Sequence, residues 1–245
     1  NSPNIGLSAL LSVAGIAQDS VNSARIAFGL SPRINAAGRM GKADRAVQLL
    51  LCQNMMEALN IANEIDAENS ARQQIERKIC EEVIDIVEAK GYKHDRVIVV
   101  VGEGWHHGVV GIVASRISEK YGVPCIILSS EGDISCGSGR SFEGFSLYNA
   151  INAVKDLTVK FGGHEQAAGI TLKTEDIDEF RKRINEYARG CEFAIPKLSL
   201  DCKLNPSALS LDLAFALKVL EPYGNANQIP LFGVFGARLD RITPI

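Results

Sequence analysis

The chain has 245 residues, of which 46% are hydrophobic and 22% are charged, a composition typical of globular proteins. Its length suits one large domain or two smaller ones. The net charge of −3 at pH 7 excludes a global basic field that attracts nucleic acid, so any binding of phosphates must depend on a local cluster.

Apolar residues of 4–52 recur in helix-like runs on both sides of a segment with the character of a loop, GLSPRINAAGRMGKADR. This segment combines Arg33, Arg39 and Arg45 with three glycines. Glycine lets a backbone approach an anion closely, and arginine binds phosphate through its planar fork. The segment is therefore a candidate contact to an anion.

Residues 55–90 contain no glycine or proline, and isoleucine and valine recur there at helical spacings before Gly91. One helix of roughly 50 Å is predicted. Its middle, DAENSARQQ, has no large apolar residue, so we expect that part to face solvent on most sides. Such a helix is typical of a link between two lobes.

Two continuous β-branched runs, RVIVVV (96–101) and PCIILS (124–129), predict strands that are buried on both faces. A helical pattern begins near Val109 and ends near Gly122 between them. A strand, a helix and a second strand joined by a short crossover imply a right-handed parallel pair in an α/β layer.

The later elements mix strands and helices, with a change of pattern at Lys197. In chain order we expect a strand ISCGSGRS, a helix 146–156 capped by Ser146, a strand 169–172, a helix capped by Thr174, and then a short strand, a helix 207–220 and a strand LFGVFGARLDRI.

Three stretches at the ends of the α/β strands have the chemistry of phosphate contacts, and ligands of open sheets bind at such ends. GEGWHHG lies at a helix N-terminus, which favours anions, GSGRS offers hydroxyls and a guanidinium, and FGGHEQAAG offers bare backbone and an imidazole. The candidate residues are His106, Ser138, Arg140, Ser141, Gly162, Gly163 and His164.

Each candidate also has a simpler interpretation. Gly162 and Gly163 can form a plain turn, and His106 can be a capping residue. Arg140 can belong to a surface ion pair of little consequence, and Trp105 can belong to the core. The convergence of three such stretches in one small α/β unit favours the binding of an anion.

The sequence indicates no reaction centre. The four histidines show no H-x-x-x-H spacing and no carboxylate pair nearby, so no metal site is predicted. No P-loop and no serine nucleophile elbow is present, and the catalytic residues are unknown. We therefore expect a substrate-binding unit.

None of the six cysteines belongs to a C-x-x-C pair, and most lie in apolar runs, which is typical of a reducing compartment. No apolar run reaches the length of a membrane span, and no signal-peptide pattern is present. We expect a cytoplasmic protein without a membrane partner. The ends, Asn1-Ser2-Pro3 and Pro244-Ile245, suggest a piece of a longer protein.

Five motifs occur in the order seen in the RecJ family of single-strand-specific DNA exonucleases, which are DHH phosphoesterases, and nearly the whole chain resembles that family. The motifs are SPRINAAGRMGKADRAVQLL, GEGWHHGVVGIVASRISEKYGVPCIIL, GSGRS, FGGHEQAAGITL and EPYGNANQIPLF. The resemblance implies an α/β protein with four parts. These are the end of the DHH catalytic lobe (1–52), a linker helix (53–91), the α/β DHH-associated domain (92–196) and the start of an OB-fold domain (197–245).

The resemblance also implies a function. In the family, two divalent ions, Mn²⁺ or Mg²⁺, activate water that hydrolyses single-stranded DNA from its 5′ end. The motif that binds those ions is absent here, so we expect a fragment that holds no metal, binds DNA and is inactive alone. Arg39, Arg33 and the seven candidates above become contacts to DNA, with Arg140 and His164 facing one groove. A monomer is expected, and helicases and single-strand binding proteins are candidate partners.

Two alternatives remain open. The chain could belong to a DHH phosphodiesterase for short oligonucleotides or cyclic dinucleotides, although its OB-like extension favours longer substrates. It could also be a non-catalytic nucleic-acid-binding module, which the negative net charge permits.

Overall fold

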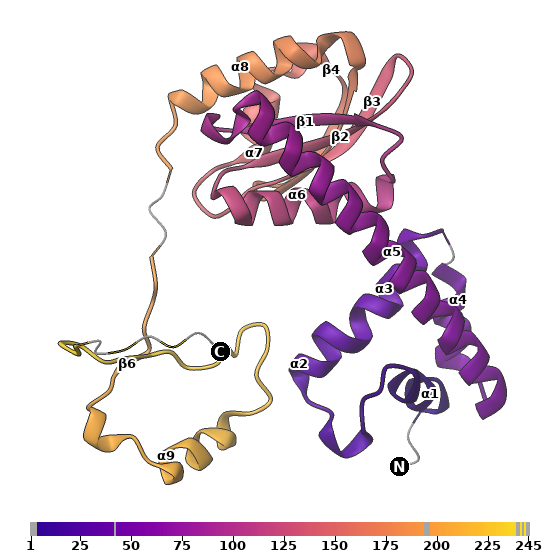
Figure 1. Cartoon of the computed structure of the whole chain (residues 1–245), viewed down its shortest axis with the longest axis vertical. Helices are drawn as coiled ribbons and strands as arrows, with labels where there is room; N and C mark the ends of the chain where they lie inside the picture. Colours follow the sequence, from indigo (N-terminus) through magenta and orange to yellow (C-terminus); the bar gives the residue numbers. More distant parts are fainter. Residues whose placement is uncertain (1–3, 42, 194–196, 239–240, 242, 244–245) are drawn as a thin grey trace.

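The computed structural model describes residues 4–41, 43–193, 197–238, 241 and 243. Three groups of elements follow one another along the chain: N-terminal helices, a sheet with its helices, and a C-terminal segment (Figure 1). No helix in the described ranges is both long and apolar enough to cross a membrane.

The first group consists of α1 (Ile5–Val13), α2 (Ser23–Arg25), α3 (Ser31–Arg39) and α4 (Ala43–Leu51). One apolar core contains residues of α1, α3 and α4. α3 and α4 occupy most of the segment predicted as a loop, so that prediction is wrong. Pro32 lies in the first turn of α3, where a missing N–H costs no hydrogen bond. Ala36 and Ala37, whose small size suggested a loop, are fully buried in the helix packing.

The long helix predicted from the sequence is present as α5 (Met55–Lys90). The side chain of Asn54 caps its start, and Gly91, with a φ of 71°, ends it in the left-handed conformation. The first half of α5 contributes to the core of the N-terminal helices, and the last half contributes to a core under the sheet. α5 therefore joins the two cores.

Most residues of the middle of α5 (66–74) are exposed or half-buried, as expected, but one polar stripe of the helix is buried. Asn69, Arg72 and Glu76 are 3%, 8% and 2% exposed. Arg72 donates to both neighbours, and Arg116 of α6 (His107–Tyr121) forms an ion pair with Glu76. The polar residues avoid water because they are paired with one another at the contact of α5 with α6.

The sheet has the strand order β1-β2-β3-β5-β4 and consists of β1 (Ile98–Glu103), β2 (Cys125–Glu131), β3 (Ile134–Arg140), β4 (Thr158–Gly163) and β5 (Ala167–Lys173). β1 and β2 are parallel and α6 connects them, as predicted. The other pairs are antiparallel, so the sheet is mixed. β4 was not predicted, because its two terminal glycines suggested a loop.

Helices cover the two faces of the sheet unequally. α5 and α6 form a core with residues of β1 and β2, whereas α7 (Leu147–Asn152) and α8 (Ile177–Arg189) pack on β1, β2 and β5 from the other side. Ser146 caps α7 as predicted, but the hydroxyl of Thr174 bonds a carbonyl in the β2–β3 turn instead of capping α8. Among the described residues, β5 and β4 contribute none to the core that α5 and α6 form with the sheet.

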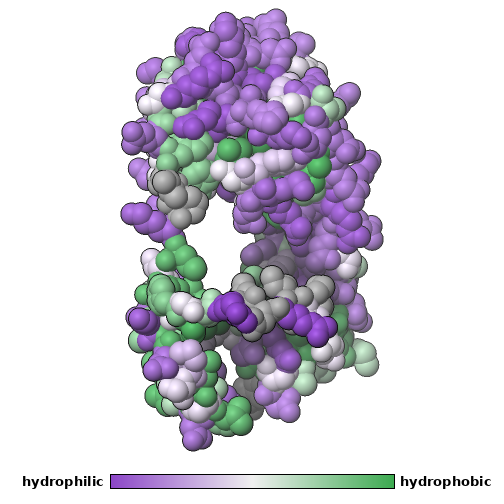
Figure 2. Space-filling model, turned by 60° about the vertical axis from the view of Figure 1, so that its left-hand side comes forward, coloured by the Kyte–Doolittle hydropathy of each residue, from purple (hydrophilic) through white to green (hydrophobic). Residues whose placement is uncertain are grey.

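The C-terminal segment, residues 197–238, contains β6 (Cys202–Lys203), α9 (Leu211–Ala216) and β7 (Phe232–Gly233), and β6 pairs with β7. None of its residues is buried, and hydrophobic side chains gather on its surface (Figure 2). The predicted helix 207–220 is shorter than expected, and the predicted last strand extends beyond the described residues. These elements do not confirm the start of an OB fold.

Candidate functional site

The loop after β1 leads directly into α6. Trp105 is 6% exposed and donates its indole N–H to Glu82 Oε2 at 2.7 Å, which favours a structural role over a stacking platform. His106 is the N-cap of α6, and its Nδ1 accepts the N–H of Gly108 at 3.1 Å. Because Nδ1 accepts, the neutral ring carries its proton on Nε2, which can donate to a ligand.

Two glycines of α6 leave room for two arginines. A Cβ on Gly108 would lie 2.3 Å from the backbone oxygen of Arg39, whose Nη1 donates to the Gly108 carbonyl at 3.1 Å. A Cβ on Gly111 would lie 2.9 Å from Nη2 of Arg140. Residues three apart share one side of a helix. α6 therefore brings Arg39, at the end of α3, next to Arg140 of β3.

Arg39, Ser138 and Arg140 form what we call the arginine cluster. Nη1 of Arg140 donates to Ser138 Oγ at 2.6 Å and to the Gly139 carbonyl at 2.7 Å. Burial, and then the positive charge of Arg39, lower the pKa of Arg140 from its ordinary value. An arginine keeps its charge at neutral pH even so.

The cluster has positive charge without a matching carboxylate. Neither Arg39 nor Arg140 forms an ion pair with an acidic side chain in the part of the chain that the structure describes. The exposed Arg39 and the half-buried Arg140 carry like charges, which repel each other. A bound anion relieves that repulsion and accepts hydrogen bonds from both guanidinium groups.

Gly162 and Gly163 differ in what surrounds them. Gly163 has a φ of 148°, and a Cβ there would lie 2.2 Å from the carbonyl oxygen of Ala167, so the protein itself requires glycine. A Cβ on Gly162 would meet no atom within 4 Å, and its φ lies outside the left-handed region. Gly169, which pairs with Gly162 across β4 and β5, is equally open. Packing therefore explains Gly163 but neither Gly162 nor Gly169.

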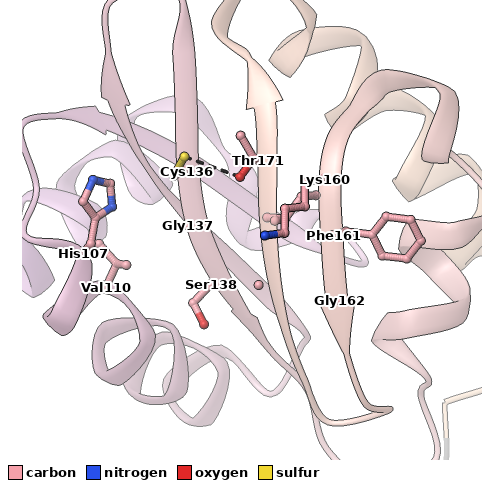
Figure 3. A pocket seen from close by; sticks show the side chains of 11 residues that line it. His107, Val110, Cys136, Gly137, Ser138, Lys160, Phe161, Gly162 and Thr171 are labelled. Carbon is pink, nitrogen blue, oxygen red and sulfur yellow. Dashed lines mark hydrogen bonds between the residues drawn. The ribbon is translucent and has the colours of Figure 1, made fainter.

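The space above Gly162 and Gly169 belongs to a groove of about 590 Å³ on the α6 side of β3, β5 and β4 (Figure 3). Ser138 of the arginine cluster, Lys160 and Thr171 also line it. No acidic side chain is among the described residues that line this groove. The groove adjoins the arginine cluster through Ser138.

His164 lies at the start of the β4–β5 turn and is exposed. The backbone N–H of His164 donates to the Ala167 carbonyl at 2.7 Å, and Ala167 pairs with Arg140 across β5 and β3. His164 and Arg140 therefore approach the same residue. Because neither lines the groove, the prediction that both face it stays a prediction.

Two other predicted contacts have partners within the protein. The hydroxyl of Ser141 donates to a backbone carbonyl at 2.9 Å. Arg33 ties α3 to α5, because its Nε donates to Asp66 Oδ1 at 2.7 Å and its Nη1 donates to the Gly29 carbonyl at 2.7 Å. A role of Ser141 or Arg33 in binding substrate stays a prediction.

Five residues of the site were not identified from the sequence: Gly108, Gly111, Lys160, Gly169 and Thr171. The G-x-x-G spacing in the helix was a usable signal, because it places two gaps on one side. Lys160 alternates with Gly162, which puts both on one face of a strand once β4 is known. The pairing of Gly162 with Gly169 depends on the strand register, which the sequence does not reveal.

The donor set of the site does not fit a divalent metal. Mg²⁺ and Mn²⁺ prefer carboxylates, whereas the arginine cluster offers guanidinium groups and a hydroxyl. Within the described ranges, no group of three or more His, Cys, Asp or Glu side chains is placed to hold a metal. The arginine cluster therefore suits an anion rather than a metal ion.

Residues 94–190 match the DHHA1 domain family. Over 98% of its length the chain is 37% identical to the single-stranded-DNA-specific exonuclease RecJ of Bacillus subtilis (strain 168). Over 93% of its length it is 35% identical to the protein of the same name from Escherichia coli (strain K12). The chain spans only 31% and 41% of these two relatives.

Solved structures give the same result. RecJ from Thermus thermophilus in complex with Mg²⁺ matches 94% of the chain at 31% identity with a TM-score of 0.83, and the complex with Mn²⁺ matches 96% with a TM-score of 0.84. The chain covers 36% and 35% of those two structures. The α/β fold and the resemblance predicted from the sequence are confirmed. Residues 94–190 belong to the DHHA1 domain family, and over nearly its whole length the chain is a homologue of the RecJ exonucleases.

Proposed function

We propose that this chain binds the phosphates of single-stranded DNA as part of an exonuclease of DNA repair and recombination. One observation carries the proposal: Arg39 and Arg140, which are distant in sequence, lie together beside Ser138 without a carboxylate partner among the described residues. The names of the relatives support single-stranded DNA as the substrate.

The arginine cluster suits one phosphodiester group. Each guanidinium offers several N–H donors in a plane, and the Ser138 hydroxyl adds a further donor. His106, with a free Nε2–H at the start of α6, lies at a helix end whose dipole favours an anion. These groups neutralise and orient the backbone of the strand without reading its bases, so the binding is independent of sequence.

We propose that hydrolysis depends on groups outside these 245 residues. The Thermus structures contain Mg²⁺ or Mn²⁺, and two-metal hydrolysis requires carboxylate and histidine ligands that the arginine cluster does not supply. In the full-length enzyme such ions would activate the water. The residues described here would hold the strand and fix the position of its phosphate. The 245-residue chain alone is then expected to bind and not to cleave.

We propose the division of the chain that the sequence predicts: the end of the DHH lobe (1–52), the linker helix (53–91), the DHHA1 domain (92–196) and the start of an OB-fold domain (197–245). Separate hydrophobic cores at the two ends of α5 support the first three parts. We also propose a monomer in the cytoplasm, with helicases or single-strand binding proteins as partners. Six cysteines without a disulfide suit that reducing compartment.

The test measures binding of a fluorescent, phosphorylated oligo-dT to the 245-residue chain. Arg140→Ala and Arg39→Ala should each weaken binding by about 1.5–3 kcal/mol, which is tenfold or more, because each removes charged hydrogen bonds. The slope of log K against log salt should fall by about 0.7 for each lost phosphate contact. Arg33→Ala should lose less affinity for oligo-dT, because the Arg33 side chain already bonds Asp66 and the Gly29 carbonyl.

Arg183→Ala is the matched control. Arg183 lies on α8, on the opposite face of the sheet, and pairs with the exposed Asp156. Its loss should leave the affinity for DNA unchanged. Equal affinities of wild type, Arg39→Ala and Arg140→Ala would contradict the proposal, and so would robust cleavage of the DNA by this chain in Mn²⁺.

A further inference from the structure

Beyond the arginine cluster, the groove has a regular floor. The register of β4, β5 and β3 aligns residues in rows across the three strands. One row contains Gly162, Gly169 and Ser138, and we call it the glycine row. Arg140 and Ala167 form the next row on one side, toward the arginine cluster.

The row on the other side of the glycine row is polar. It consists of Lys160, Thr171 and Cys136, which all line the groove. Figure 3 shows the Lys160 side chain extending from β4 across β5 into the groove. Lys160 is exposed and forms no ion pair with an acidic side chain in the described ranges. Its ammonium group is therefore available to a ligand.

The rows have a spacing that suits a polymer. Residues two apart on a strand are separated by about 7 Å, so the Lys160 row lies about 7 Å from the glycine row along the sheet. The guanidinium group of Arg140 lies at the Ser138 end of the glycine row, because its Nη1 donates to Ser138 Oγ at 2.6 Å. Gly162 and Gly169 in the glycine row present backbone only, and they let a bulky group lie flat on the sheet. Two cations one row apart along the sheet, with bare backbone beside them, suit two successive phosphates of a single strand.

We propose that Lys160 and the glycine row form a second nucleotide subsite, in which Lys160 binds the phosphate that follows the one held by the arginine cluster. This proposal rests on the proposed function. The sugar and base between the two phosphates pack over Gly162 and Gly169, and the Thr171 hydroxyl lies beside Lys160 as a further donor. The subsite fixes the path of the strand along β4 and β5.

The test compares ligands of different length on the 245-residue chain. Thymidine 5′-monophosphate offers one phosphate, and the phosphorylated dinucleotide pdTpdT offers two. Both compete against a fluorescent oligo-dT. Lys160→Ala should weaken the binding of pdTpdT on the order of tenfold and leave the affinity for the mononucleotide unchanged. Its salt slope for oligo-dT should fall by about 0.7.

The control is Lys182→Ala, which removes an equally long side chain on α8, away from the groove. It should behave like wild type with every ligand. Arg140→Ala should weaken the binding of both ligands, and this difference from Lys160→Ala separates the first subsite from the second.

Three results would overturn the proposal. If Lys160→Ala binds pdTpdT like wild type while Arg140→Ala binds it weakly, the phosphate site exists without this second subsite. If Lys160→Ala weakens the mononucleotide equally, Lys160 belongs to the first subsite. If the wild type binds none of the ligands, the proposed function falls together with the subsite.

Discussion

Gly162 and Gly163 are adjacent, yet the structure predicts opposite effects of adding a side chain. A Cβ on Gly163 would lie 2.2 Å from the Ala167 carbonyl oxygen and 2.6 Å from the Ala168 Cα, at a φ of 148°. Both neighbours are backbone atoms, which cannot rotate away. Gly163→Ala should therefore destabilise the fold by about 1–3 kcal/mol.

Gly162→Val should not destabilise the fold. No atom lies within 4 Å of the added Cβ, and valine suits a strand better than glycine does. Loss of the flexible glycine from the unfolded chain stabilises by about 0.4–1 kcal/mol. The same isopropyl group projects into the groove, where it takes the space of the ligand. Affinity for oligo-dT should fall by at least about tenfold, or 1.4 kcal/mol.

Urea denaturation and fluorescence anisotropy measure the two effects separately. In thermal unfolding, each kcal/mol corresponds to a shift of roughly 2–4 °C for a domain of this size. A stable Gly162→Val protein that binds oligo-dT like wild type would refute the reasoning. A Gly163→Ala protein as stable as wild type would show that the backbone can relax and that both glycines serve the ligand.

Two further predictions concern buried groups. Glu76→Gln should destabilise the fold by about 3 kcal/mol in urea denaturation, because Arg72 loses its charged partner in the interior. The double change Arg72→Met with Glu76→Met should destabilise the fold less, because it leaves no unpaired buried charge of that pair. Equal stability of Glu76→Gln and wild type would contradict this prediction. Burial raises the pKa of the Cys125 thiol well above its usual range, so its charged form is disfavoured only in the folded state. Stability should fall as the pH rises above about 8.5, the pKa of an unfolded thiol, and iodoacetamide at pH 8 should alkylate the exposed Cys202 long before Cys125, as mass spectrometry can check.

The parallel pair β1 and β2 could be predicted because buried strands require unbroken β-branched runs, and RVIVVV and PCIILS supply them. The loop predicted over α3 failed for a physical reason. Glycine and alanine suit loops, but they also let one helix approach another closely, and Ala36 and Ala37 are used in that way. Composition alone does not distinguish the two uses.

The chemistry of the candidate site was predictable, but its geometry was not. Arginine, serine and glycine in a short motif predicted Ser138 and Arg140 as phosphate contacts; the structure shows Arg140 donating to Ser138 Oγ, and their contact to a phosphate stays a prediction. The approach of Arg39 depends on the packing of α3 on α6 at Gly108, a tertiary contact over 69 positions in the chain. Lys160 enters the groove only through the register of β4, a strand whose glycines concealed it.

The buried polar stripe in the middle of α5 shows the same limit. A polar stretch without large apolar residues predicts exposure, which holds for most of residues 66–74 but not for the positions whose polar groups have partners in the interior. Here Arg72 donates to Asn69 and Glu76 at helical spacings of three and four residues, and Arg116 of α6 adds an ion pair with Glu76. The spacing was visible in the sequence, but the helix that covers it was not.

A crystal structure of the chain with pdTpdT tests the central claim most directly. The account predicts one phosphate with its oxygens about 2.7–3.2 Å from the Arg140 and Arg39 guanidinium groups and the Ser138 hydroxyl. A dinucleotide that is ordered elsewhere on the molecule, with only water at the arginine cluster, would contradict it.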